Sequence, residues 1–106
     1  MNSHGLAHIR AREDKLVADE QRRQKLLPVA RALRDPDVAA VIIKEARVQV
    51  QKWRDKKLCS PCYIESWESL LDSPELAAKI LEDKSKNANQ MRQNSPFVSA
   101  VRRYAA

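Results

Sequence analysis

Glycine is almost absent from this 106-residue sequence, in which Gly5 is the single example. Hairpins, bulged strands and phosphate-binding loops depend on glycine, because glycine reaches positive φ angles without steric cost. A chain with no glycine after residue 5 therefore lacks the dinucleotide- and nucleotide-binding glycine motifs, and it is a poor candidate for a β-protein. Good helix formers dominate instead, so we predict an all-α fold, a small bundle of four to six helices with no sheet.

Long apolar runs are also missing. No stretch approaches the roughly 20 apolar residues of a membrane-spanning helix, and the N-terminal region is charged from Arg10 onward, without the apolar core of a signal peptide. We therefore expect a cytoplasmic protein that does not associate with membranes. In that reducing compartment the two cysteines are expected to be thiols rather than a structural disulfide.

The charge of the chain is unevenly distributed. There are 20 lysines and arginines against 14 acidic residues, a formal net charge of +6. Residues 59–82 are nevertheless acidic, with five acidic residues against one lysine, and the segments on either side are basic. This asymmetry favours either an anionic partner for the basic segments or ordinary solvated helix faces.

Four proline-marked positions predict where helices begin. Each has a capping residue followed by proline, which is favoured in the first helical turn: Asp35-Pro36, Ser60-Pro61, Ser73-Pro74 and Ser95-Pro96. They predict helices over about 36–57, 61–72 and 74–83, and a short final helix from residue 96. The stretch 83–94 is expected to be a short polar helix or a loop. Pro28 either opens a helix over 26–34 or kinks a longer one.

The helix over 36–57 has the clearest core-facing stripe, at spacings of three and four residues: Ala39, Ile42, Ile43, Ala46, Val50 and Trp53. Trp53 and Trp67 are predicted to pack together across the corner that follows. The polar run from Gln90 to Asn94 has few core residues, and it indicates either a buried hydrogen-bonded cap or a contact surface.

The domain organisation follows from these patterns. Residues 1–34 are basic and thinly apolar, and we expect a partly mobile helical arm that a partner can stabilise. Residues 35–106 are expected to form the compact helical domain. The residues predicted to contact a protein partner lie on the arm: Leu16, Val17, Arg22, Arg23 and Leu26.

A small nucleic-acid-binding regulator is the alternative interpretation. It would use cations of the arm and of the basic turn that ends the 36–57 helix, namely Arg10, Arg12, Lys15, Lys52, Arg54, Lys56 and Lys57. The corner between the 61–72 and 74–83 helices is similar to a helix-turn-helix. Its second helix, however, carries more acidic than basic residues and would be repelled by phosphates.

A third interpretation is a redox or zinc protein. Cys59 and Cys62 have dithiol spacing at a predicted helix start, where a helix N-terminus and nearby lysines lower a thiol pKa. A zinc site would combine these cysteines with His4 and His8. The alternative is two small residues at a capping corner, because no βα unit accompanies them. No nucleophile has a histidine partner outside the arm, so we expect neither catalysis nor a cofactor.

The block from Trp53 to Phe97 resembles small uncharacterised bacterial helical proteins of the antitoxin or regulator kind. The resemblance rests on the run W-x9-Y-I-x2-W-x2-L-L, from Trp53 to Leu71, and on the ending M-R-Q-N-S-P-F. It implies a non-catalytic interaction protein, antitoxin-like, that neutralises another bacterial protein. The expected partner is therefore a toxin-like or regulatory protein, with a homodimer or a nucleic acid as alternatives.

Overall fold

The structure is a computed structural model, which describes the backbone of residues 3–104 and the side chains of residues 9–104. It confirms the predicted all-α fold, with six helices and no strand within the described residues. The helices are α1 (Ser3–Leu33), α2 (Pro36–Asp55), α3 (Pro61–Leu71), α4 (Pro74–Glu82), α5 (Lys86–Arg92) and α6 (Val98–Tyr104).

Three of the four predicted helix starts are confirmed. Proline occupies the first position of α2, α3 and α4. The preceding side chain caps each helix: Asp35 accepts from the N–H of Asp37, and the hydroxyls of Ser60 and Ser73 accept from the amides of Tyr63 and Leu76. These contacts satisfy amides that have no partner within the helix, and they fix where each helix begins.

The fourth predicted start is wrong by two residues. Helix α6 begins at Val98, and the Ser95 hydroxyl instead accepts a hydrogen bond from the N–H of Phe97, at 3.1 Å. Pro96 and Phe97 precede the helix and are buried, so packing against the body takes precedence over the local capping signal. Helix α5 begins without a proline, where the Ser85 hydroxyl accepts from the Ala88 amide.

The end of α2 shows how a chain with so little glycine reverses direction. Lys57 has a φ of 55°, the left-handed conformation that usually belongs to glycine after a helix. The N–H of Leu58 donates to the carbonyl of Trp53, and the N–H of Lys57 donates to that of Arg54. This pair of bonds is the Schellman motif, which closes the helix and turns the chain toward α3.

Helix α1 is a single long helix that contributes to the core only through its C-terminal part. It contains Pro28, so of the two alternatives for this proline the longer helix is the one observed. Leu26, Val29, Ala30 and Leu33 are buried, and α1 packs chiefly against α4. The predicted division at residue 34 therefore does not describe the packing, because the last two turns of the predicted arm belong to the core.

The aromatic core differs from the predicted Trp53–Trp67 pair. Trp53 packs instead against Tyr63, with ring centroids 6.0 Å apart, and Trp67 meets Phe97 edge-to-face at 5.6 Å. Trp67 and Phe97 are almost completely buried, so this second pair ties α3 to the segment that leads into α6. Each tryptophan thus anchors a different part of the body.

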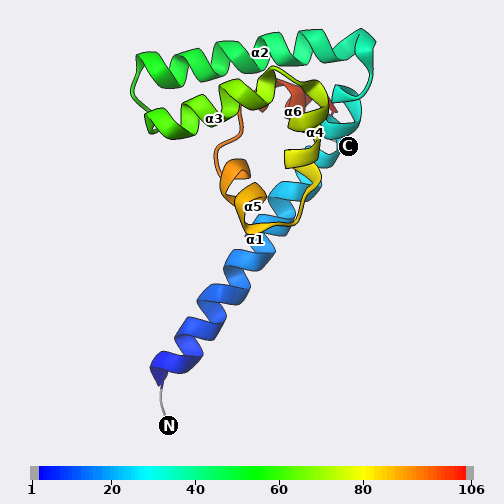
Figure 1. Cartoon of the computed structure of the whole chain (residues 1–106). Helices are drawn as coiled ribbons and strands as arrows, with labels where there is room; N and C mark the ends of the chain where they lie inside the picture. The colour runs from blue at the N-terminus through cyan, green and yellow to red at the C-terminus, as the bar shows by residue number, and fades with distance from the viewer. Residues whose placement is uncertain (1–2, 105–106) are drawn as a thin grey trace.

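The molecule is elongated because the N-terminal part of α1 extends away from the other helices (Figure 1). Its principal extents are 57 × 31 × 21 Å. Helices α2 and α3 lie side by side at the end of the molecule farthest from the N-terminus, and α4 and α5 lead back toward α1 (Figure 1). None of the helices in the described part of the chain is long and apolar enough to span a membrane.

The contrast between the two parts of α1 gives a stability prediction. Leu26→Ala removes a side chain that is 4% exposed, and we expect it to lower the free energy of unfolding by about 2–5 kcal/mol. Leu16→Ala, the same change at a side chain that is 60% exposed, should alter it by no more than about 0.5 kcal/mol. Urea unfolding measures both, and equal losses would contradict this division of α1.

Candidate functional site

The projecting part of α1 carries apolar side chains that nothing else in the described structure covers. Residues 9–17 are all exposed, and among them Ile9, Leu16 and Val17 are more than half accessible to solvent. Ile9 and Leu16 are seven residues apart and share one helix face, with Val17 at its edge. We call these three residues the arm strip.

The arm strip is not a continuation of the face by which α1 contacts the body. At 3.6 residues per turn, it lies roughly a third of a turn away from the stripe of buried residues between Leu26 and Leu33. Toward the N-terminus that buried stripe passes into Arg22, Asp19 and Lys15 instead. Helix α1 therefore leaves the core because its core-facing side becomes charged, and its exposed apolar side points in another direction.

A shallow hollow lies along α1 between the arm strip and the body. It is lined by side chains of this helix alone: Leu16, Val17, Glu20, Gln21, Gln24 and Lys25. Two aliphatic side chains at one end and amide and charged groups at the other give the surface both an apolar and a polar part. A hollow lined by one helix would leave most of a small molecule exposed, whereas typical small-molecule sites enclose most of their ligand.

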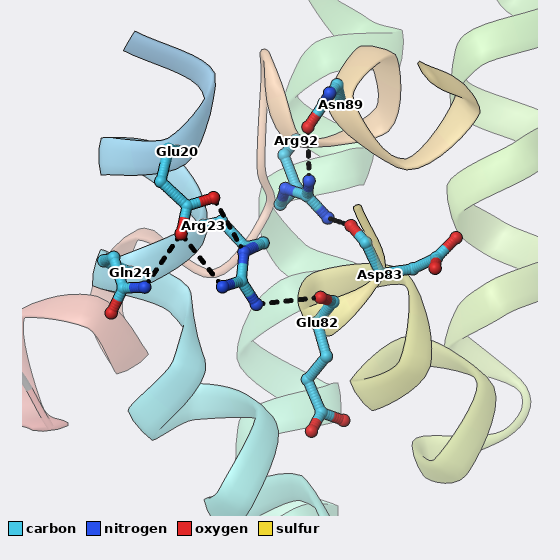
Figure 2. A network of polar contacts seen from close by, with 7 residues as sticks. All are labelled: Glu20, Arg23, Gln24, Glu82, Asp83, Asn89 and Arg92. Carbon is cyan, nitrogen blue, oxygen red and sulfur yellow. Dashed lines mark hydrogen bonds and ion pairs between the residues drawn. The ribbon is translucent and has the colours of Figure 1, made fainter. Parts of the chain in front are cut away.

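A network of polar contacts holds the base of the arm (Figure 2). Arg23 donates to both carboxylate oxygens of Glu20, at 3.0 and 2.9 Å, and to the carbonyl oxygen of Glu82, at 3.0 Å. Gln24 also donates to Glu20, at 2.9 Å, and the buried Asp19 pairs with Arg22 at 2.8 Å. Arg23 thereby connects α1 to the last residue of α4.

Arg92 lies on the other side of the same helix end (Figure 2). Its side chain is only 2% exposed, and one terminal nitrogen donates to the carbonyls of Ile80 and Asp83, at 2.7 and 2.6 Å. The other terminal nitrogen donates to the Asn89 side chain. A helix leaves its last carbonyls without partners, so two arginines from different helices complete the C-terminal end of α4.

The charges in this network influence one another. Burial lowers the pKa of Arg92, and the positive charge of Arg23 lowers it further, whereas Asp83, Asp19 and Glu20 oppose that effect. The hydrogen bonds from Arg23 and Gln24 lower the pKa of Glu20 to about 2. The acidic groups of the network therefore offset the repulsion between the two arginines.

The hydroxyl of Tyr63 contacts the backbone of the polar run that precedes Ser95. It donates to the carbonyl of Met91 at 2.5 Å, lies 2.7 Å from the carbonyl of Asn94, and accepts from the Asn94 amide at 3.1 Å. Within the polar run, Arg92 is a buried hydrogen-bonded cap, whereas the side chains of Gln90, Gln93 and Asn94 are exposed, so a contact surface stays a prediction for those three. Arg92 could have been noticed because it lies four residues after Ala88, on the same helix face as that core residue.

The structure separates the predicted partner-contact residues. Leu16 and Val17 are exposed on the arm strip, and Arg22 is partly exposed beside Asp19. Arg23 is largely withdrawn into the network at the base. Leu26, also predicted to contact a partner, is instead placed in the core, against neighbours that only the fold brings together.

The cations proposed for nucleic-acid binding form two groups at opposite ends of the molecule. Arg10, Arg12 and Lys15 lie on the arm, whereas Lys52, Arg54, Lys56 and Lys57 lie where α2 ends (Figure 1). Arg54 is paired with Glu68. The two groups thus do not form one continuous basic surface.

The dithiol hypothesis gains no support from the local electrostatics. Cys59 and Cys62 are free cysteines, and burial raises the pKa of the Cys59 thiol instead of lowering it as the sequence suggested. The side chains of His4 and His8 lie outside the described residues. Among the side chains that the structure does describe, no group of three or more potential metal ligands occurs.

Comparison with known proteins identifies no relative. No family model matches the chain, and no curated protein or solved structure matches it. The resemblance to antitoxin or regulator proteins therefore stays a prediction, and the function has to be argued from the site itself.

Arg92 gives the first prediction for the site. Arg92→Ala leaves buried carbonyls at the end of α4 without donors, so we expect a loss of about 3 kcal/mol in the free energy of unfolding. Arg92→Lys keeps the charge but not the fork of donors, and it should recover only part of that loss. Arg102→Ala, at an exposed arginine, is the control for urea unfolding. If Arg92→Ala unfolded at the same urea concentration as the wild type, Arg92 would not stabilise the end of α4.

Glu20 gives a prediction for acid stability. Its folded pKa of about 2 lies below the ordinary value of 4.5, so its contribution to stability is complete above pH 4.5 and is lost as the pH falls toward 2. The stability difference between wild type and Glu20→Gln should therefore be constant at neutral pH and shrink between pH 4.5 and 2. Thermal unfolding across this range measures it. A difference that persists at pH 2 would show that the Glu20 charge is not responsible.

Proposed function

We propose that this protein acts by binding another protein rather than by catalysis, as an antitoxin-like neutralising partner. The observation that carries the proposal is the arm strip, with Ile9, Leu16 and Val17 exposed on a helix that extends away from the body. Apolar side chains grouped on one face of a projecting helix are suited to the groove of another protein, where their burial provides binding energy. The polar network at the base holds the helix to the body.

The charges of the arm favour a protein over a nucleic acid. Residues 9–18 contain three cations and two carboxylates, Glu13 and Asp14, so their charges nearly cancel. Nucleic-acid affinity depends on a surplus of cations facing phosphates, and aliphatic side chains gain little from that contact. A groove in a protein, by contrast, offers both apolar contacts for Leu16 and polar contacts for the charges beside it.

The test uses the full chain as bait in a lysate of the organism that encodes it. Wild type is expected to retain a protein in stoichiometric amount, and the double variant Leu16→Glu/Val17→Glu is expected to lose it, because two charges replace the apolar contact. Ala11→Glu is the matched control, since it adds a charge to the opposite, exposed face of the same helix segment. It should retain the protein.

Three outcomes would contradict the proposal. Retention by the Leu16→Glu/Val17→Glu variant would show that the arm strip is not the contact. Retention that depends only on nucleic acid, and disappears with nuclease, would favour the regulator instead. Light scattering of the purified chain covers the third outcome: a dimer that the double variant converts to a monomer would identify a second copy as the partner.

A further inference from the structure

A second exposed apolar surface lies between α2 and α6, at the other end of the molecule from the arm. A hollow of about 170 Å³ opens there, lined by Glu45, Val48, Gln49, Lys52, Pro96, Val98 and Ser99. Val48 and Val98 remain 55% and 44% exposed, and Val41 lies one heptad before Val48 on the same face of α2. A cavity of about 150 Å³ can hold a benzene ring, so this hollow has room for one large apolar side chain.

Cations that have no ion pair in the described structure border the hollow. Glu45, the carboxylate in its lining, is held by Arg103 at 2.6 and 2.8 Å. Lys44 and Lys52 are exposed, and each lies four residues from Val48, which makes them its neighbours on the helix surface. Arg102 stands one turn beyond Val98. None of these three cations forms an ion pair with a described side chain.

Most carboxylates of the acidic segment are paired with arginines away from this surface. In the acidic segment 59–82, Glu68 pairs with Arg54, Asp72 with Arg47, and Glu75 and Glu82 with Arg34. Four of its five acidic residues, all but Glu65, thus pair with arginines of α2 or with Arg34, which lies between α1 and α2. The cations beside the hollow are left to an external partner.

We propose that the hollow between α2 and α6 binds an acidic amphipathic segment of a partner protein. An apolar side chain of that segment enters the hollow against Val48 and Val98, and its carboxylates lie against Lys44 and Lys52. A nucleic acid would satisfy the lysines through its phosphates but would leave the valines without apolar contact. This surface is separate from the arm strip, and the inference does not rest on the function proposed for the arm.

The test uses three fluorescent probes with the full chain. The first is a synthetic helical peptide with leucine on one face and glutamate on both flanks. The second is the same peptide with lysine in place of glutamate, and the third is a DNA duplex. Fluorescence anisotropy is measured at low and at high salt. We expect the acidic peptide to bind at least about tenfold more tightly than its basic twin, and less tightly as salt increases.

Two pairs of substitutions locate the binding. Lys44→Glu/Lys52→Glu should weaken acidic-peptide binding by about tenfold or more, because like charges then face each other. Lys79→Glu/Lys86→Glu changes the net charge equally at exposed lysines of α4 and α5, and it should weaken binding by less than about twofold. Val48→Thr tests the apolar part without changing the charge and should also weaken binding, with circular dichroism confirming that each variant is folded.

Any one of the following results would overturn the inference. Equal weakening by the two lysine pairs would mean that net charge alone attracts the peptide. Equal affinity for the acidic and basic peptides, or no binding of the acidic peptide, would remove the charge complementarity. Tighter binding of the duplex, lost in Lys44→Glu/Lys52→Glu, would make the surface a nucleic-acid contact. None of these peptide-binding results affects the outcome of the lysate experiment on the arm strip.

Discussion

The end of α4 is the point on which the arrangement of the molecule depends. A helix that ends inside a small body exposes carbonyl groups with no partner, and leaving them unsatisfied away from water is costly. Arg92 from α5 and Arg23 from α1 supply the missing donors to Ile80, Asp83 and Glu82. Because the two arginines come from different helices, completing one helix end also fixes three helices relative to one another. The acidic residues around them limit the repulsion between two close guanidinium groups.

The projecting arm follows from this constraint together with the pattern of α1. The helix is apolar on its body-facing side only from Leu26 onward, and Asp19 and Arg23 take over at the edge of the core. Beyond them no described side chain of the body holds the helix, so residues 9–17 are accessible on every side. The apolar residues that remain in this segment form the arm strip on a different face. The network that completes the end of α4 thus lies at the point where α1 leaves the body.

Local signals predicted most of the fold, and non-local packing decided the rest. The starts of α2, α3 and α4 could be predicted because a capping side chain and a proline act within a few residues. The start of α6 could not, because Phe97 is committed to Trp67, a residue 30 positions earlier. The same limit applies to the site. The exposure of Leu16 and Val17 could be predicted, because the apolar stripe of the arm is thin. The burial of Leu26 could not, because it depends on packing against α4. The acceptors of Arg92 could not be predicted either, because they come together only when the chain has folded.

The distribution of ion pairs explains why the exposed surfaces are basic although the sequence contains an acidic segment. Arg34, between α1 and α2, and two arginines of α2 pair with carboxylates of the acidic segment 59–82, and such exposed pairs add little stability individually. Their larger effect is on the charge that remains, because they use carboxylates that would otherwise balance the lysines. The surplus of positive charge in the net charge of +6 therefore lies partly on exposed lysines that have no ion pair among the described residues, such as Lys44 and Lys52 beside exposed valines. Exposed apolar side chains bordered by cations without an ion pair are typical of surfaces that bind other molecules, and the proposal for the hollow between α2 and α6 rests on that combination.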